Sequence, residues 1–85
     1  MEKSIYTREY EILLDLMRDE RVRNGVTQVE LAAFLGEEQS WISKVERGER
    51  RIDVVELRAW CQGLGVNFIS LMRQFEKQAK SSKRK

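Results

Sequence analysis

Apolar side chains recur along this chain at intervals of three and four residues, which is the spacing of one face of an α-helix. One stripe of this kind runs over about residues 7–24 and another follows residue 67. The first consists of Tyr6, Tyr10, Leu13, Leu14 and Met17 and ends in a charge at Arg21, and the second consists of Phe68, Leu71, Met72 and Phe75. No segment of useful length alternates apolar and polar residues as a half-buried strand does. The pattern therefore predicts an all-α fold.

Capping residues and glycines divide the chain into five predicted helices. Thr27 and Asp53 each have a glutamate three residues later, which is the pattern of a capping box, and Asn67 is a further N-cap. The glycines that predict helix ends are Gly25, Gly36, Gly48, Gly63 and Gly65. The second helix thus lies between Thr27 and Gly36, and the third covers about residues 39–47. The connection of about three residues between them is what a helix-turn-helix requires.

Together these helices predict one small domain over residues 1–76, followed by a basic, flexible tail over residues 77–85. The tail holds five of the 16 lysines and arginines, so the net charge of +2 is weak evidence for a nucleic-acid partner. The distribution of charge is better evidence, because four basic residues gather in residues 44–51 whereas acidic residues gather in residues 2–20. Such polarity suits a protein with one DNA-facing side.

The composition argues against several other classes of protein. Histidine is absent and Cys61 is the only cysteine, so the chain lacks the usual general base, an internal disulfide and a cysteine-based metal site. We therefore expect no enzyme, no cofactor and no metal. No apolar run approaches the roughly 18 residues of a membrane span, and the N-terminus lacks the apolar segment of a secretory signal. We expect no membrane partner and a cytoplasmic location.

Three blocks of sequence follow one another at a characteristic spacing. The first, within residues 17–36, contains RNGVTQVELA; the second, within residues 39–50, contains SKVERGE; the third is LGV at residues 64–66. These blocks, which span most of residues 17–72, closely resemble the lambda-repressor and Cro-like family, often called the XRE family. The resemblance implies a compact five-helix DNA-binding domain whose second and third helices form the helix-turn-helix.

The resemblance also implies which residues meet double-stranded DNA. In such a motif the first turns of the recognition helix face base edges in the major groove. The implied base-reading residues are Gln39, Ser40, Ser43 and Lys44. The implied phosphate contacts are Gln28, Arg47, Arg50 and Arg51. Glutamine can pair bidentately with adenine and lysine can donate to guanine, while an amide at the start of the second helix reinforces the positive end of its dipole.

Two further sets of residues receive structural roles. Arg21 and Glu46 occupy the positions where the family forms an ion pair between the first and third helices. The C-terminal stripe lies on a fifth helix that the first four helices do not obviously need. Its four apolar residues can belong to the core or to a dimer interface, and of the two we expect the interface of a homodimer. They are Phe68, Leu71, Met72 and Phe75.

Four residues depart from the family pattern, and one of them, Ile52, stands where proline is common and should change little. Glu37 and Glu38 replace the usual apolar residue and small hydroxyl cap before the recognition helix, and their charge favours the helix dipole but repels phosphate. Trp41 is large for a position that is usually small and polar. It can pack against the second helix near Phe34, stack on a sugar or thymine methyl group, or face a partner protein.

These observations predict a sequence-specific transcriptional regulator, a repressor or autoregulator that binds a near-palindromic operator as a homodimer. Its recognition helix is expected over about residues 39–47. The alternative is a protein-interaction module, an antitoxin-like or adaptor protein with a second protein partner, in which Trp41 and Phe34 form the binding patch.

Overall fold

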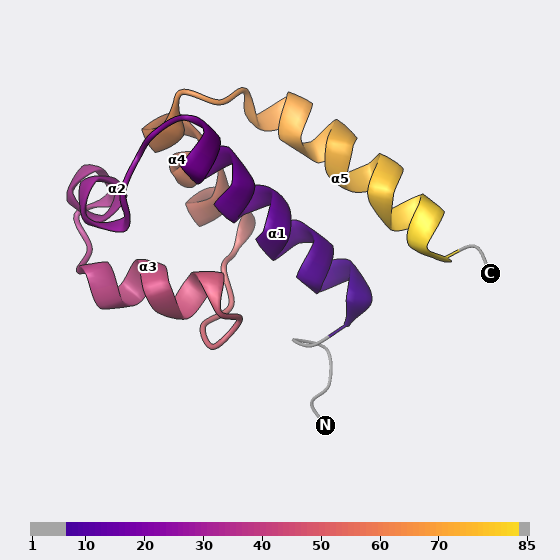
Figure 1. Cartoon of the computed structure of the whole chain (residues 1–85), viewed down its shortest axis with the longest axis horizontal. Coiled ribbons are helices and arrows are strands. Elements are labelled where there is room, and N and C mark those ends of the chain that lie inside the picture. The colour runs from indigo at the N-terminus through magenta and orange to yellow at the C-terminus, as the bar shows by residue number, and fades with distance from the viewer. Residues whose placement is uncertain (1–6, 84–85) are drawn as a thin grey trace.

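Five helices connected by short turns make up the computed structural model, which describes residues 7–83 (Figure 1). They are α1 (Arg8–Arg23), α2 (Gln28–Leu35), α3 (Gln39–Glu46), α4 (Val54–Leu64) and α5 (Phe68–Lys83). No strand occurs within these described residues, so the predicted all-α, five-helix fold is confirmed. None of the helices in this part of the chain is long and apolar enough to cross a membrane.

The helices begin where the capping residues predicted. The hydroxyl of Thr27 accepts a hydrogen bond from the Glu30 amide, and the Glu30 carboxylate accepts one from the Thr27 amide, which completes a capping box. Asp53 and Glu56 form the same box at the start of α4. Each box satisfies amide groups that the first helical turn leaves without partners. Local sequence therefore fixes the start of both helices.

Gly63 has a different role from the predicted one, because it lies inside α4 and does not end that helix. The left-handed C-cap of α4 is Gly65, with a φ of 72°. A β-carbon placed at Gly63 would lie 2.7 Å from Leu31 Cδ1 and 2.8 Å from Phe34 Cδ2. Gly63 therefore allows α2 to approach α4 closely, a requirement that only packing reveals.

The core gathers around α1, which lies between α3 and α5 (Figure 1). The buried side chains of α1 include Ile12 and Leu16, which were not part of the apolar stripe predicted for this helix. Both contribute to the core because α5 covers a second face of α1. The largest fully buried side chains are Trp60, Met17, Leu31, Ile42 and Leu71.

The C-terminal helix corrects two predictions. Leu71 is 1% exposed and belongs to the core, so it is not available to a dimer partner. Phe68, Met72 and Phe75 are partly buried against that same core. In addition, α5 continues to Lys83 with Ala79 buried, where a flexible tail was expected from residue 77. Arg84 and Lys85 lie outside the described residues.

Candidate nucleic-acid interface

The turn between α2 and α3 positions the predicted recognition helix. Gly36 ends α2 in the left-handed conformation, with a φ of 70°, and the Glu37 amide donates to the Ala32 carbonyl over 2.9 Å. Glu38 is the N-cap of α3, but its side chain makes no capping hydrogen bond. Ile42 and Val45 are fully buried and anchor α3 to the core. The opposite side of α3 is consequently turned to solvent.

That outward side carries the predicted base-reading residues. Gln39, Ser40 and Lys44 are exposed, while Ser43 is half-buried. Gln39 and Ser40 are the first two residues of the helix, where a recognition helix reaches bases. The structure therefore leaves three of the four accessible on α3, with Gln39 and Ser40 in its first turn and Lys44 in its last turn.

A chain of polar contacts connects this surface to the protein interior. The Arg21 guanidinium donates to both carboxylate oxygens of Glu46, over 2.6 Å and 3.1 Å. The Gln28 amide donates to Glu46 Oε1 over 3.0 Å, and its own oxygen accepts from Gln39 Nε2 over 3.0 Å. The Arg21 and Glu46 side chains are only 12% and 6% exposed. A largely buried ion pair thus orients Gln28, and Gln28 in turn orients Gln39.

This arrangement leaves Gln39 equipped to read a base. Its amide has two hydrogens and one oxygen, and only one hydrogen is used by Gln28. One donor and one acceptor remain, which is the set that pairs bidentately with N7 and N6 of adenine. The bond between Gln28 and Gln39 could not be foreseen from the sequence, because it depends on the crossing of α2 and α3.

Arg47 lies just after the recognition helix and is held by its neighbours. Its guanidinium donates to both carboxylate oxygens of Glu49, over 2.9 Å and 3.1 Å, and also to the Ser43 hydroxyl. The Arg47 guanidinium and the Glu49 carboxylate are both exposed. The hydrogen bond between them lowers the pKa of the Glu49 carboxyl and raises the pKa of Arg47. Ser43 therefore positions Arg47 in the free protein.

The next two arginines stack on aromatic rings. The Arg50 guanidinium lies 5.0 Å from the ring centroid of Trp41, and it donates to the Arg51 carbonyl over 2.6 Å. The Arg51 guanidinium lies 4.6 Å from the ring centroid of Tyr10. The Tyr10 hydroxyl accepts a hydrogen bond from the Ile52 amide over 3.2 Å, which ties the loop after α3 to α1. Predicted phosphate ligands are thus preoriented along one loop.

Trp41, which could pack against the second helix, stack on DNA or face a partner protein, is half-buried against the core. Its ring centroid lies 6.5 Å from that of Trp60 in α4, and Arg50 covers a ring face. The half-buried ring forms a wall of a surface groove of about 550 Å³ beside α3. The groove is also lined by Glu37, Glu38, Ser40, Lys44, Glu49 and Arg50.

Residues 7–83 hold no group of three or more potential metal ligands from histidine, cysteine, aspartate and glutamate. Cys61 is buried, and that burial, together with the charge of Glu20, raises the pKa of its thiol. A thiol in this state is a poor nucleophile.

Comparison with known proteins yields related domains. A family model described as a helix-turn-helix domain matches residues 12–68. An XRE-family like protein from Pseudomonas syringae pv. tomato is 43% identical, with a TM-score of 0.83, over 89% of this chain and 93% of that one. An HTH-type transcriptional regulator of Sinorhizobium fredii is 38% identical over 52 residues, covering 61% of this chain and 68% of its own length.

A more distant structure shares the fold. The restriction-modification controller protein C.Esp1396I, as a tetramer in complex with its natural 35 base-pair operator, superposes with a TM-score of 0.75. It is 22% identical, and the match covers 84% of this chain and 93% of that one.

Proposed function

Since the chain belongs to the XRE family of helix-turn-helix proteins, we propose that it regulates transcription by placing α3 in the major groove of DNA. The observation that carries this proposal is the outward, preoriented amide of Gln39, held by Gln28 at the first turn of α3. A side chain whose rotamer is fixed before binding loses less entropy when it contacts a base. Gln39, Ser40 and Lys44 supply the sequence readout.

Contacts to phosphate come from the start of α2 and from the loop after α3. Gln28 keeps one amide hydrogen that Glu46 does not use, at the positive end of the α2 dipole. Arg47, Arg50 and Arg51 flank α3 on its C-terminal side, with Ser43 holding Arg47. An amide on one side of the recognition helix and guanidinium groups on the other set its register on the duplex.

The protein acts as a homodimer on a near-palindromic operator, as a repressor or autoregulator. One recognition helix touches only a few base pairs, too few to select a site among roughly 10⁶ competing sequences. Two copies related by a two-fold axis double the contacts and set the half-sites about one helical turn apart. In the alternative, an interaction module built on Trp41 and Phe34, the open part of the patch would be Phe34, which is 59% exposed, since Trp41 is half-buried against Trp60 and Arg50.

The test starts from DNA selected by the purified protein from a random pool. Replacing Gln39 with alanine should weaken binding to the selected site by about 1–3 kcal/mol, because a bidentate contact to one base is lost. Binding to unrelated DNA should change much less. An equal loss on both DNAs, measured by fluorescence anisotropy, would show that Gln39 does not read sequence.

A further inference from the structure

The carboxylate of Glu49 occupies a guanidinium group that we assign to DNA phosphate. Arg47 Nε donates to Glu49 Oε2 over 2.9 Å, and Arg47 Nη2 donates to Glu49 Oε1 over 3.1 Å. Two parallel bonds of this kind are also how an arginine grips the oxygens of a phosphate. A side of the Arg47 guanidinium that could hold a phosphate is therefore already filled by the protein itself.

The turn after α3 holds Glu49 in this place. Its amide donates to the Lys44 carbonyl over 2.8 Å, and the Gly48 amide donates to the Val45 carbonyl over 3.0 Å. Together with the φ of 79° at Gly48, these two bonds form a Schellman motif at the end of the helix. Because this motif fixes the backbone between them, the Glu49 carboxylate lies beside the Arg47 guanidinium.

A second proposed DNA ligand lies within the field of the same carboxylate. The pKa of the Glu49 carboxyl is lowered first by the hydrogen bond from Arg47 and further by the charges of Arg47 and Lys44. Lys44, Glu49 and Arg50 line the same groove beside α3. Glu49 is therefore an ionised carboxylate among cations that we assign to DNA.

We propose that Glu49 sets the affinity of the protein for DNA by competing with a phosphate for Arg47. The inference rests on the proposed function, because it supposes that Arg47 meets DNA. Binding then requires that an internal carboxylate be exchanged for a phosphate. Since phosphate contacts occur on any sequence, the competition lowers the affinity for selected and unrelated DNA by a similar factor. It limits the time spent on unrelated DNA without changing which sequence is preferred.

The exchange requires little rearrangement of Arg47. The Ser43 hydroxyl accepts a further hydrogen bond from Arg47 Nη1, which keeps the guanidinium at α3 when the carboxylate leaves. Of the five donor hydrogens of the guanidinium, Glu49 uses two and Ser43 uses one. A phosphate can therefore contact the remaining hydrogens before Glu49 is released. The Arg47 and Glu49 side chains are 54% and 52% exposed, so a phosphate can reach them.

This exposure also limits the size of the effect. Exposed ion pairs contribute a factor of about 1.4 to 5 to an equilibrium constant. Removing the competing carboxylate should therefore strengthen DNA binding by about two- to fivefold. Damage to the fold would weaken DNA binding, so it cannot produce this gain.

Fluorescence anisotropy of the full chain tests the proposal on the selected DNA and on an unrelated duplex of the same length. The salt concentration is about 0.15 M, where the Debye length of about 8 Å screens distant charges. Glu49→Gln should strengthen binding to both duplexes at least about twofold more than Glu37→Gln does. Glu37 lines the same groove and has no ion pair within residues 7–83, so its variant measures the general effect of losing one negative charge.

A double-mutant cycle assigns the gain to Arg47. In an Arg47→Gln background, Glu49→Gln should strengthen binding no more than Glu37→Gln does in the parent, because the group for which Glu49 competes is gone. The matched control is Glu11→Gln, which removes the exposed partner of Arg8 on α1 and should change the affinity by less than about 1.5-fold.

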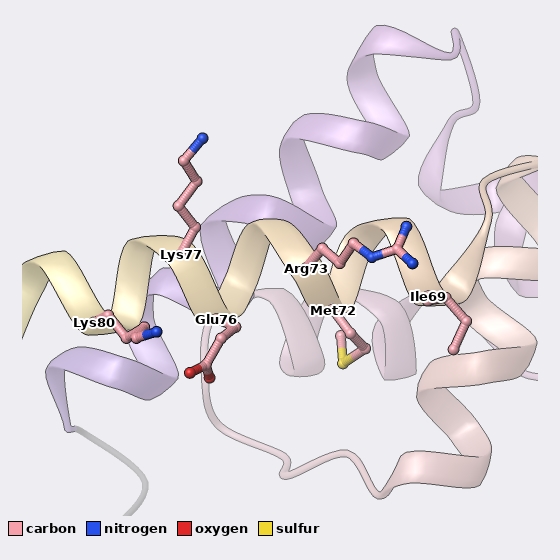
Figure 2. A pocket seen from close by; sticks show the side chains of 6 residues that line it. All are labelled: Ile69, Met72, Arg73, Glu76, Lys77 and Lys80. Carbon is pink, nitrogen blue, oxygen red and sulfur yellow. The ribbon is translucent and has the colours of Figure 1, made fainter.

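The charged residues of α5 are unsuitable as controls. Figure 2 shows Glu76 between Met72 and Lys80, on the face of α5 that also carries the exposed Ile69. A substitution on this partly apolar face can also change the association of two copies, which would alter DNA binding for another reason.

Equal gains from Glu49→Gln and Glu37→Gln would overturn the proposal, as would a gain that persists in full without Arg47. Weaker binding by Glu49→Gln would also overturn it, because Glu49 would then position Arg47 for DNA. A parent that binds selected DNA in a Gln39-dependent manner, without the gain, would keep the proposed function and remove this inference. An Arg47-dependent gain on unrelated DNA, in a protein that selects no sequence, would keep the inference and remove the function.

Discussion

The side chain of Gln28 illustrates how single residues at this surface carry more than one role. Its amide donates to Glu46 and its oxygen accepts from Gln39, so the same group links the buried ion pair to the proposed base-reading residue. Only its second amide hydrogen remains for a phosphate. The contribution of Gln28 to DNA binding is therefore partly indirect, through the orientation of Gln39.

A double-mutant cycle measures this indirect part. Replacing Gln28 with alanine should weaken binding to the selected DNA, and the effects of Gln28→Ala and Gln39→Ala should not add. We expect a coupling of about 0.5–3 kcal/mol, the range found for residues in direct contact. The control pairs Gln39→Ala with Gln74→Ala, an exposed glutamine on α5, and these two effects should add. Additivity in the first cycle would mean that Gln28 does not orient Gln39.

At the scale of elements, the pair of Arg21 and Glu46 ties α1 to α3. Arg21 also donates to the Val26 carbonyl over 2.9 Å, so the same guanidinium fixes the turn before α2. Both side chains are largely buried, which makes the loss of one partner more harmful than the loss of both. The main effect of the ion pair is therefore to hold the recognition helix in position, and its contribution to net stability is small.

Urea unfolding of two variants tests that reasoning. Replacing Arg21 with methionine should lower the free energy of unfolding by roughly 3–5 kcal/mol, because the Glu46 charge is left buried. The double variant R21M/E46M should recover a large part of this loss. Arg8→Met removes the exposed pair with Glu11 and serves as the control, with an expected change below about 1 kcal/mol. A double variant less stable than R21M would contradict the argument.

The contact between α2 and α4 gives a second prediction at this scale. Alanine at Gly63 improves helix propensity by about 1 kcal/mol, but its methyl group would meet fully buried Leu31 at 2.7 Å. Overpacking of this kind costs about 1–3 kcal/mol, so Gly63→Ala should lower the melting temperature. Gln62→Ala, at the exposed neighbouring position, should not. A higher melting temperature for the Gly63 variant would show that Leu31 moves aside easily.

At the scale of the whole molecule, basic side chains gather at one end of the recognition surface. Arg47 and Arg51 are exposed there, while Arg8 lines a surface pocket together with Gln78 and Ser81 of α5. Binding to DNA should therefore weaken steeply with salt, since each phosphate contact releases counterions. The dependence comes mainly from the arginines of the loop after α3, because the Gln28 amide at the start of α2 carries no charge.

The slope of log affinity against log salt concentration measures the number of phosphate contacts. Arg47→Gln and Arg51→Gln should each reduce its magnitude by about 0.9. Arg50 is less suitable for this measurement, because its removal also uncovers Trp41. Arg8→Gln should leave the slope unchanged. Slopes identical to the parent in both loop variants would mean that these arginines do not bind phosphate.

The sequence by itself determined the helices and the location of the helix-turn-helix. Capping boxes at Thr27 and Asp53 and the glycine at position 36 act through bonds between near neighbours, so their patterns can be read along the chain. The exposed positions of α3 were predictable for the same reason, since burial of Ile42 and Val45 fixes the opposite face.

Only the tertiary structure decided what those elements contact. Leu71 belongs to the core because α5 packs along α1. Position 63, inside α4, is a glycine because α2 approaches α4 closely there. The partners of Gln28 and Arg50 likewise come from other segments. Helical periodicity shows that a residue lies on a given face, but not which distant segment covers that face. That depends on how the helices cross, which is set jointly by the side chains of the whole core.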